Sequence, residues 1–129
     1  MANEKILVCD DEMQYAQVIA FKFRNAGYEV TTALDGQEAL KSAKAQKPDL
    51  IITDYQMPRL DGMDLCREIR KDPGLANIPL ILLTAFGMDL GQEKIEEAGV
   101  SALISKPFSP RDLLSKAKEL LEQTVLCKG

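Results

Sequence analysis

The chain has 129 residues, 46% of them hydrophobic, which fits one globular domain over residues 1–129 with a core of about residues 5–124. The formal net charge of −4 argues against broad contact with a nucleic-acid backbone, so we expect no direct DNA binding. The apolar runs are short, so we expect no segment that spans a membrane.

The composition also limits the chemistry, because the sequence contains no histidine. This excludes the commonest general base, the commonest metal ligand and the usual partner of a nucleophilic serine or cysteine. Three scattered cysteines, an odd number, indicate reduced thiols rather than a disulfide framework or a zinc site. The N-terminus has no apolar signal region, so we expect a cytoplasmic protein.

The first half of the chain predicts two units, each a strand followed by a helix. The first strand is Lys5–Cys9, and the helix after it carries an apolar stripe and ends at Gly27. The second strand is Tyr28–Thr32, and its helix starts at Asp35-Gly36. The residues expected on the buried faces of the two helices are Ala16, Ile19, Ala20 and Phe23, then Gly36, Ala39, Leu40 and Ala43.

The second half predicts three more units of the same kind. The strands are expected at Asp49–Thr53, Ile78–Thr84 and Val100–Ser105. A helix with Leu65, Cys66 and Ile69 on one face follows the first of them, and a weaker helix at about Leu90–Ala98 follows the second. Ser109-Pro110 begins the last helix, whose stripe is Leu113, Ala117, Leu120 and Leu121.

Five strand-helix units with nearly continuous apolar strands predict an α/β fold. Such strands are buried on both faces, as in a parallel sheet that helices cover on two sides. Five units are too few for an eight-stranded barrel, so an open, doubly wound sheet remains. In this architecture ligands bind beyond the carboxyl ends of the strands.

Polar residues stand at the predicted carboxyl ends of four strands: Asp10-Asp11, Asp54, Thr84 and Lys106. These residues would share one edge of the sheet, which we call the rim. Three carboxylates crowded at the rim repel one another, so the arrangement favours a bound cation. Oxygen ligands without histidine or cysteine indicate Mg²⁺, or alternatively Mn²⁺. A carboxylate can also attack phosphorus, and a lysine and a hydroxyl would then stabilise the phosphoryl oxygens.

Four segments, each at a strand end, resemble the receiver domain of two-component response regulators: "LVCDDE", "LIITDYQMPRLDG", "ILLTAF" and "ISKPF". The resemblance runs from about Lys5 to the last helix. It implies a flavodoxin-like (βα)5 domain with a five-stranded parallel sheet in the order 2-1-3-4-5. It also implies a phosphoacceptor switch rather than an enzyme, either standing alone or forming part of a longer regulator.

The resemblance assigns roles to the residues of the rim. Asp54 is the phosphoacceptor, and Thr84 and Lys106 contact the phosphoryl group. Asp11 binds Mg²⁺ directly, together with the Asp54 carboxylate and the backbone carbonyl of Gln56, while Asp10 acts through water. The Lys106-Pro107 peptide bond is cis, which an X-Pro bond adopts readily.

The resemblance also implies the partners. The phosphoryl donor is a histidine on a histidine kinase or a histidine phosphotransfer protein, which fits a chain without histidine. The signal passes to a downstream protein through the face made by the fourth helix, the fifth strand and the fifth helix.

Each residue also has a purely structural interpretation. Asp10 alone is more readily explained as a helix N-cap, Asp11 and Glu12 as charges at a helix N-terminus, and Asp54 as a turn residue. We interpret Asp61-Gly62 as turn and cap chemistry only. The joint occurrence of acids, hydroxyl and lysine on one rim favours the functional interpretation.

Three other functions stay open at this point. A phosphatase of the haloacid dehalogenase type would need a second aspartate two residues after its nucleophile, where this chain has Gln56 after Asp54 and Glu12 after Asp10. A flavodoxin-like FMN carrier would need a hydroxyl- and glycine-rich loop after the first strand, where acids stand instead. A degenerate receiver that only binds partners is opposed by the complete acidic set.

Two positions tune the expected response. Leu103 stands where many members of the resembling family have a switch aromatic, and we expect it to be buried before phosphorylation because leucine gains nothing from exposure. Phosphorylation would then move the loop Ala85–Gly87 more than the surroundings of Leu103. Gln56 stands where the family tunes the lifetime of the phosphoryl group.

Overall fold

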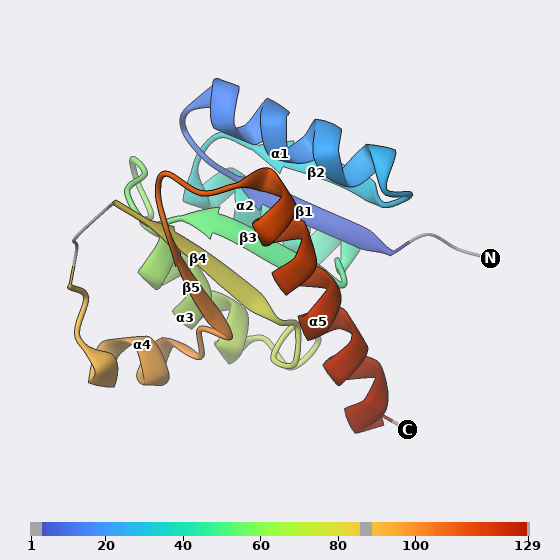
Figure 1. Cartoon of the computed structure of the whole chain (residues 1–129). Coiled ribbons are helices and arrows are strands. Elements are labelled where there is room, and N and C mark those ends of the chain that lie inside the picture. The colour runs from blue at the N-terminus through green and yellow to red at the C-terminus, as the bar shows by residue number, and fades with distance from the viewer. Residues whose placement is uncertain (1–3, 86–88, 129) are drawn as a thin grey trace.

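Strands and helices alternate along the whole chain (Figure 1). The computed structural model describes residues 4–85 and 89–128, with residues 124–128 described by their backbone alone. The strands are β1 (Lys5–Cys9), β2 (Glu29–Ala33), β3 (Leu50–Asp54), β4 (Leu80–Thr84) and β5 (Ala102–Ser105). The helices are α1 (Met13–Asn25), α2 (Gly36–Gln46), α3 (Gly62–Lys71), α4 (Gln92–Ala98) and α5 (Pro110–Lys128).

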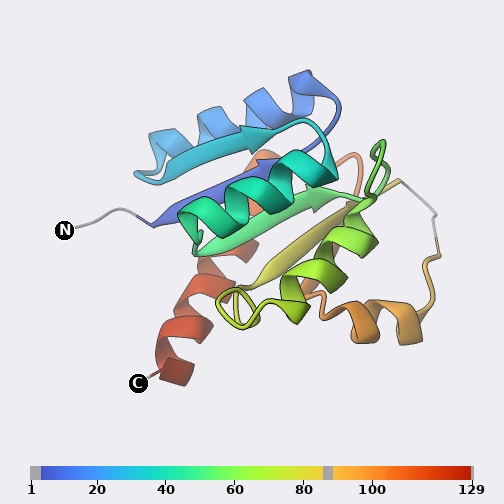
Figure 2. The ribbon, with the colours of Figure 1, turned by 180° about the vertical axis from the view of Figure 1, so that it is seen from behind.

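The strands form one parallel sheet in the order β2-β1-β3-β4-β5. Helices α1 and α5 lie on one side of it, and α2, α3 and α4 lie on the other, as the two opposite views show (Figures 1 and 2). The predicted α/β class, the doubly wound architecture and the strand order are all confirmed. Among the described helices, none combines the length and the apolar character that crossing a lipid bilayer requires.

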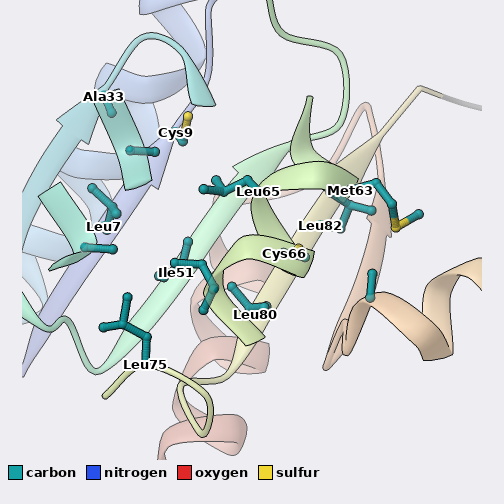
Figure 3. Close-up of a cluster of buried hydrophobic side chains, with 14 residues drawn as sticks. Leu7, Cys9, Ala33, Ile51, Met63, Leu65, Cys66, Leu75, Leu80 and Leu82 are labelled. Carbon is teal, nitrogen blue, oxygen red and sulfur yellow. The ribbon is translucent and has the colours of Figure 1, made fainter. Parts of the chain in front are cut away.

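Two apolar clusters hold the layers together, because alternate strand residues face opposite sides of the sheet. On β1, Ile6 and Val8 face α1 and α5, whereas Leu7 and Cys9 face α2 and α3. Figure 3 shows the second cluster, in which side chains of β1, β3 and β4 meet those of α3. Its labelled members are Leu7, Cys9, Ala33, Ile51, Met63, Leu65, Cys66, Leu75, Leu80 and Leu82.

The predicted helix stripes are buried except for the partly buried Leu40, but four strands begin later than predicted: β2 and β3 by one residue, and β4 and β5 by two. Strand β4 begins at Leu80 because Pro79 has no N–H to donate and the N–H of Ile78 closes a turn on the Leu75 carbonyl. Strand β5 begins at Ala102, since Ser101 belongs to the connection that leads into it.

The expectation that Leu103 is buried is wrong, because its side chain is 42% exposed. Leu103 pairs with the buried Leu82 of β4 and so faces the α3–α4 side of the sheet. Strand β5 is the edge strand, and the short helix α4 packs chiefly on α3, so the leucine lacks a cover. The companion expectation for the loop Ala85–Gly87 falls on Phe86 and Gly87, which lie outside the described residues.

Arg70, at the end of α3, binds two connecting segments through hydrogen bonds that the sequence pattern did not predict. Its guanidinium donates to the carbonyls of Ala76 and Ile78 at 2.7 Å each, and to that of Gly99 at 2.6 and 3.1 Å. Gly99 ends α4 in the left-handed region at φ 73°, where a side chain would also collide with Arg70. Arg70 therefore ties α3 to the turns that lead into β4 and β5.

We predict that Arg70→Ala lowers the free energy of unfolding by about 2–3 kcal/mol, because it leaves three carbonyls without their charged donor. The matched control is Arg67→Ala, one turn earlier on the same helix, whose carboxylate partners are 49% and 70% exposed. That control should cost less than about 1 kcal/mol. Urea unfolding measures both, and equal losses would contradict the role assigned to Arg70.

Candidate functional site

The carboxyl ends of the strands bring four predicted site residues to one rim. Asp10 follows β1, Asp54 ends β3, Thr84 ends β4 and Lys106 follows β5. The Lys106 ammonium lies 3.1 Å from Asp10 Oδ2 and 3.4 Å from Asp54 Oδ1. The structure therefore brings together charged groups that are as much as 96 positions apart in the sequence.

Lys106 is held in place by its backbone as well as by its charge. Its N–H donates to the Thr84 carbonyl at 2.7 Å, which extends the pairing of β4 and β5 by one residue. The Lys106-Pro107 peptide bond is cis, as the resemblance implied. The side chain is only 13% exposed, so its ammonium depends on the acids around it rather than on water.

Asp10 is fully buried and uses both carboxylate oxygens. Oδ1 accepts the Glu12 N–H at 2.9 Å, and Oδ2 pairs with Lys106. The N-cap of α1 is Glu12, whose side chain makes no capping hydrogen bond. The interpretation of Asp10 as the helix N-cap is therefore wrong, and its local hydrogen bond shapes the turn before the helix.

Burial dominates the electrostatics of the two inner acids. It raises the pKa of Asp54 to about 6, with the nearby Asp10 adding to the rise and Lys106 opposing it. Burial also raises the pKa of Asp10, against the Glu12 N–H and Lys106, which lower it. For Lys106, burial alone would lower the pKa, but the hydrogen bond and charge of Asp10, with Asp54, outweigh it and raise the pKa. One ammonium thus only partly compensates two buried carboxylates.

The Thr84 hydroxyl is buried at the same rim with its oxygen unsatisfied. Among the described residues, only Thr84 Oγ1 and Arg67 Nε are buried side-chain polar atoms without a hydrogen-bond partner. A buried hydroxyl without a partner destabilises a fold by about 1–3 kcal/mol. It lies on the strand next to the one that ends in Asp54, and its role in binding a phosphoryl group stays a prediction.

A group of acids at the start of α1 could hold a cation. One carboxylate oxygen from each of Asp10, Asp11 and Glu12 lies within 4.8 Å of the other two. All donors are oxygens, which suits Mg²⁺ or Mn²⁺ and does not suit zinc. Glu12 was assigned only to the helix N-terminus from the sequence, although it directly follows the acidic pair. Ligation by Asp54 and by the Gln56 carbonyl stays a prediction.

A cavity of about 260 Å³ opens above Asp54. Two of its lining residues, Tyr15 and Glu12, were not assigned to the site from the sequence, although their i, i+3 spacing puts them on one face of α1. The exposed Gln56 lies on its wall, as its position two residues after Asp54 implies. The full lining is Glu12, Tyr15, Asp54, Gln56, Ala85, Lys106 and Pro107.

The loop after β3 keeps the acceptor strand in place. Asp61 caps α3 by accepting the Asp64 N–H at 2.8 Å, and the Gly62 N–H donates to the Tyr55 carbonyl at 2.8 Å. A Cβ at Gly62 would collide with the Asp54 carbonyl and with Leu82. The interpretation of Asp61-Gly62 as cap and turn chemistry is confirmed.

The two cysteines with described side chains take no part in the site chemistry. Cys9 and Cys66 are free and buried. Burial raises the pKa of each thiol to about 12, so both stay protonated and unreactive at neutral pH. For these two cysteines, the expectation of thiols outside a disulfide framework is confirmed.

Solved receiver structures have the same fold. The chain is similar to a response regulator receiver domain protein from Clostridium thermocellum, with 32% identity and a TM-score of 0.87 over 96% of this chain and 98% of that one. It is also similar to the receiver domain of the sensor histidine kinase PA1611 from Pseudomonas aeruginosa PAO1, with 33% identity and a TM-score of 0.84. That match covers 94% and 99% of the two chains, and that structure has a magnesium ion coordinated in its active site cleft.

Curated relatives are regulators of about twice this length. The alkaline phosphatase synthesis transcriptional regulatory protein PhoP of Bacillus subtilis is 38% identical over 95% of this chain and 50% of its own length. The phosphate regulon transcriptional regulatory protein PhoB of Pseudomonas aeruginosa is 37% identical over 96% and 54%. The family model of the response regulator receiver domain matches residues 6–118. The chain therefore belongs to the response regulator receiver domain family.

Proposed function

We propose that this chain accepts a phosphoryl group on Asp54 from a histidine of a partner kinase or phosphotransfer protein, and signals by a change of conformation. The observation that carries the proposal is the Lys106 ammonium between Asp10 and Asp54 at the floor of an open cavity. Family membership agrees with it and sets aside the phosphatase and flavin-carrier alternatives.

In the transfer, an Asp54 carboxylate oxygen attacks phosphorus. The new O–P bond forms as the bond between phosphorus and the donor nitrogen breaks, and the donor imidazole leaves with the electron pair. Asp54 must be ionised to attack, and its pKa of about 6 leaves most of it ionised at neutral pH. The cavity above it leaves room for the entering group.

Lys106 and Thr84 would stabilise the transferred group. The ammonium, now shared by two carboxylates, can move to a phosphoryl oxygen, since such charge-assisted hydrogen bonds are strong. The Thr84 hydroxyl would gain the acceptor that it lacks. These two residues give the phosphorylated state contacts that the free state does not have, which is what a switch requires.

Asp10, Asp11 and Asp54, with the Gln56 carbonyl, fit a Mg²⁺ site, and Glu12 adds a further carboxylate at its edge. Bound there, Mg²⁺ or Mn²⁺ would neutralise the acidic rim and the charge of the incoming phosphoryl group. One lysine does not fully neutralise two buried carboxylates, so a bound cation would stabilise the site.

We infer that the domain works as a switch with no small-molecule reaction of its own beyond accepting and losing phosphate. The output would pass through the face of α4, β5 and α5, which displays the half-exposed Leu103 to a partner. Since relatives named as transcriptional regulators are about twice as long, such a domain can act within a longer regulator.

We predict that acetyl phosphate with Mg²⁺ adds one phosphate to the chain, and that Asp54→Asn abolishes the addition because it removes the attacking oxygen. Intact-mass spectrometry measures the product directly. The exposed Asp112→Asn is the matched control and should be phosphorylated like the wild type. Full labelling of the Asp54 variant would overturn the assignment.

A second prediction concerns the metal. Mg²⁺ should raise the melting temperature of the wild type, because it relieves repulsion among the rim acids. Asp11→Ala should weaken the Mg²⁺ affinity by about tenfold or more and slow phosphorylation. Exposed Glu122→Ala, far along α5, should do neither. An unchanged response of the Asp11 variant to Mg²⁺ would remove Asp11 from the ligand set.

A third prediction follows from the raised pKa of Asp54. Between about pH 4 and 6, the folded protein keeps a proton on Asp54 that the unfolded chain has released. Proton binding therefore stabilises the folded state at low pH, and this stabilisation is lost as the pH rises through 6. Without metal, Asp54→Asn should therefore increase the unfolding free energy by about 1–3 kcal/mol at pH 7. The gain should vanish near pH 4. Thermal melts at both pH values test it, and a destabilised variant at pH 7 would mean that the Lys106 ion pair outweighs the burial.

A further inference from the structure

Tyr15 contacts the site lysine through its aromatic ring. The Lys106 Nζ lies over the face of the ring, 4.0 Å from the ring centroid. The ring in turn packs on Phe108, with 5.9 Å between ring centroids and 41° between the planes. Tyr15 comes from α1 and Phe108 from the segment after Lys106, so the aromatic pair joins two of the chain segments that border the cavity.

Several carboxylates compete for the Lys106 ammonium. Asp10 and Asp54 hold it inside the rim, but Glu12 Oε1 also approaches it at 3.6 Å. Glu12 is 61% exposed, so an ammonium paired with it alone would move outward, away from Asp54. The Tyr15 ring adds a further contact to the ammonium in its observed position beside Asp10 and Asp54.

The cation–π contact between Lys106 and Tyr15 is strengthened by burial. The face of an aromatic ring attracts a cation, and the attraction grows as the cation is desolvated. Lys106 is 13% exposed, so water screens it little. Unlike a fourth carboxylate, the ring attracts the ammonium without adding negative charge to an already acidic rim.

We propose that Tyr15 is a positioning residue for phosphoryl transfer: its ring holds the Lys106 ammonium over Asp54, ready for the phosphoryl oxygens. The inference rests on the function proposed above. It predicts that the aromatic face, and not the hydroxyl, matters, because the ring face makes the contact. It also predicts that the effect of Tyr15 operates only through Lys106.

The geometry is tested without phosphorylation. In the full chain labelled with ¹³C and ¹⁵N, the Lys106 ε-methylene protons should show an upfield ring-current shift. The shift should persist in Tyr15→Phe and disappear in Tyr15→Leu. An unshifted Lys106 signal in the wild type, or an unchanged one in Tyr15→Leu, would overturn the inference.

The role is tested by a double-mutant cycle on the rate of phosphorylation by acetyl phosphate with Mg²⁺. Tyr15→Leu should slow the rate by about three- to thirtyfold, whereas Tyr15→Phe should stay within about twofold of the wild type. In a Lys106→Met background, which should accept phosphate more slowly, Tyr15→Leu should have no further effect. Tyr15→Met replaces Tyr15→Leu if the leucine variant does not fold.

The outcomes separate this inference from the proposed function. Equal slowing by Tyr15→Leu in both backgrounds would mean a packing role only and would overturn the positioning role. Slowing by Tyr15→Phe as large as by Tyr15→Leu would assign the effect to the hydroxyl and also overturn it. A wild type that takes no phosphate overturns the proposed function and this inference together, whereas normal transfer in Tyr15→Leu overturns this inference alone.

Discussion

A lysine ammonium shared by two buried carboxylates is the interaction on which the rest of this structure depends. Asp10 is fully buried and Asp54 nearly so, and neither could stay ionised there without a cation. Lys106 supplies one positive charge to both, and in doing so it joins the ends of β1, β3 and β5. The balance is incomplete, since burial still raises the pKa of both acids. A cation bound at the rim would relieve this deficit.

The parallel sheet is what makes this arrangement possible. Every strand runs the same way, so every strand delivers its last residue to the same edge. The backbone then continues the pairing beyond the strands: the Asp10 N–H donates to Ala33, and the Lys106 N–H to Thr84. The charged side chains thus start from positions that the sheet fixes, and the acids need little further ordering to meet the lysine. Below them, the loop closed by Gly62 keeps the end of β3 from shifting.

Sequence reasoning predicted the sheet and the rim because both follow from short, local signals. Apolar runs marked the strands, and the polar residue after each run marked the edge. The sequence could not show what depends on contacts across the fold. Leu103 proved exposed because the cover of an edge strand depends on where a short helix packs. Arg70 and Tyr15 looked like ordinary helix residues, since their partners lie in other connections and beyond β5.

Several polar groups of the site are poorly satisfied in the free chain. The Thr84 hydroxyl lacks an acceptor, Asp54 carries an unfavourable charge, and Lys106 is divided among several partners. A ligand shifts a conformational equilibrium only by what it gains in one state over the other, so such deficits are where a phosphoryl group could act. Thr84 leads directly into the connection to α4, and Arg70 fastens the far end of α4 through Gly99. Arg70 thus holds the end of α4 that lies farther along the chain from Thr84, and Leu103 lies exposed on the edge strand β5 next to β4.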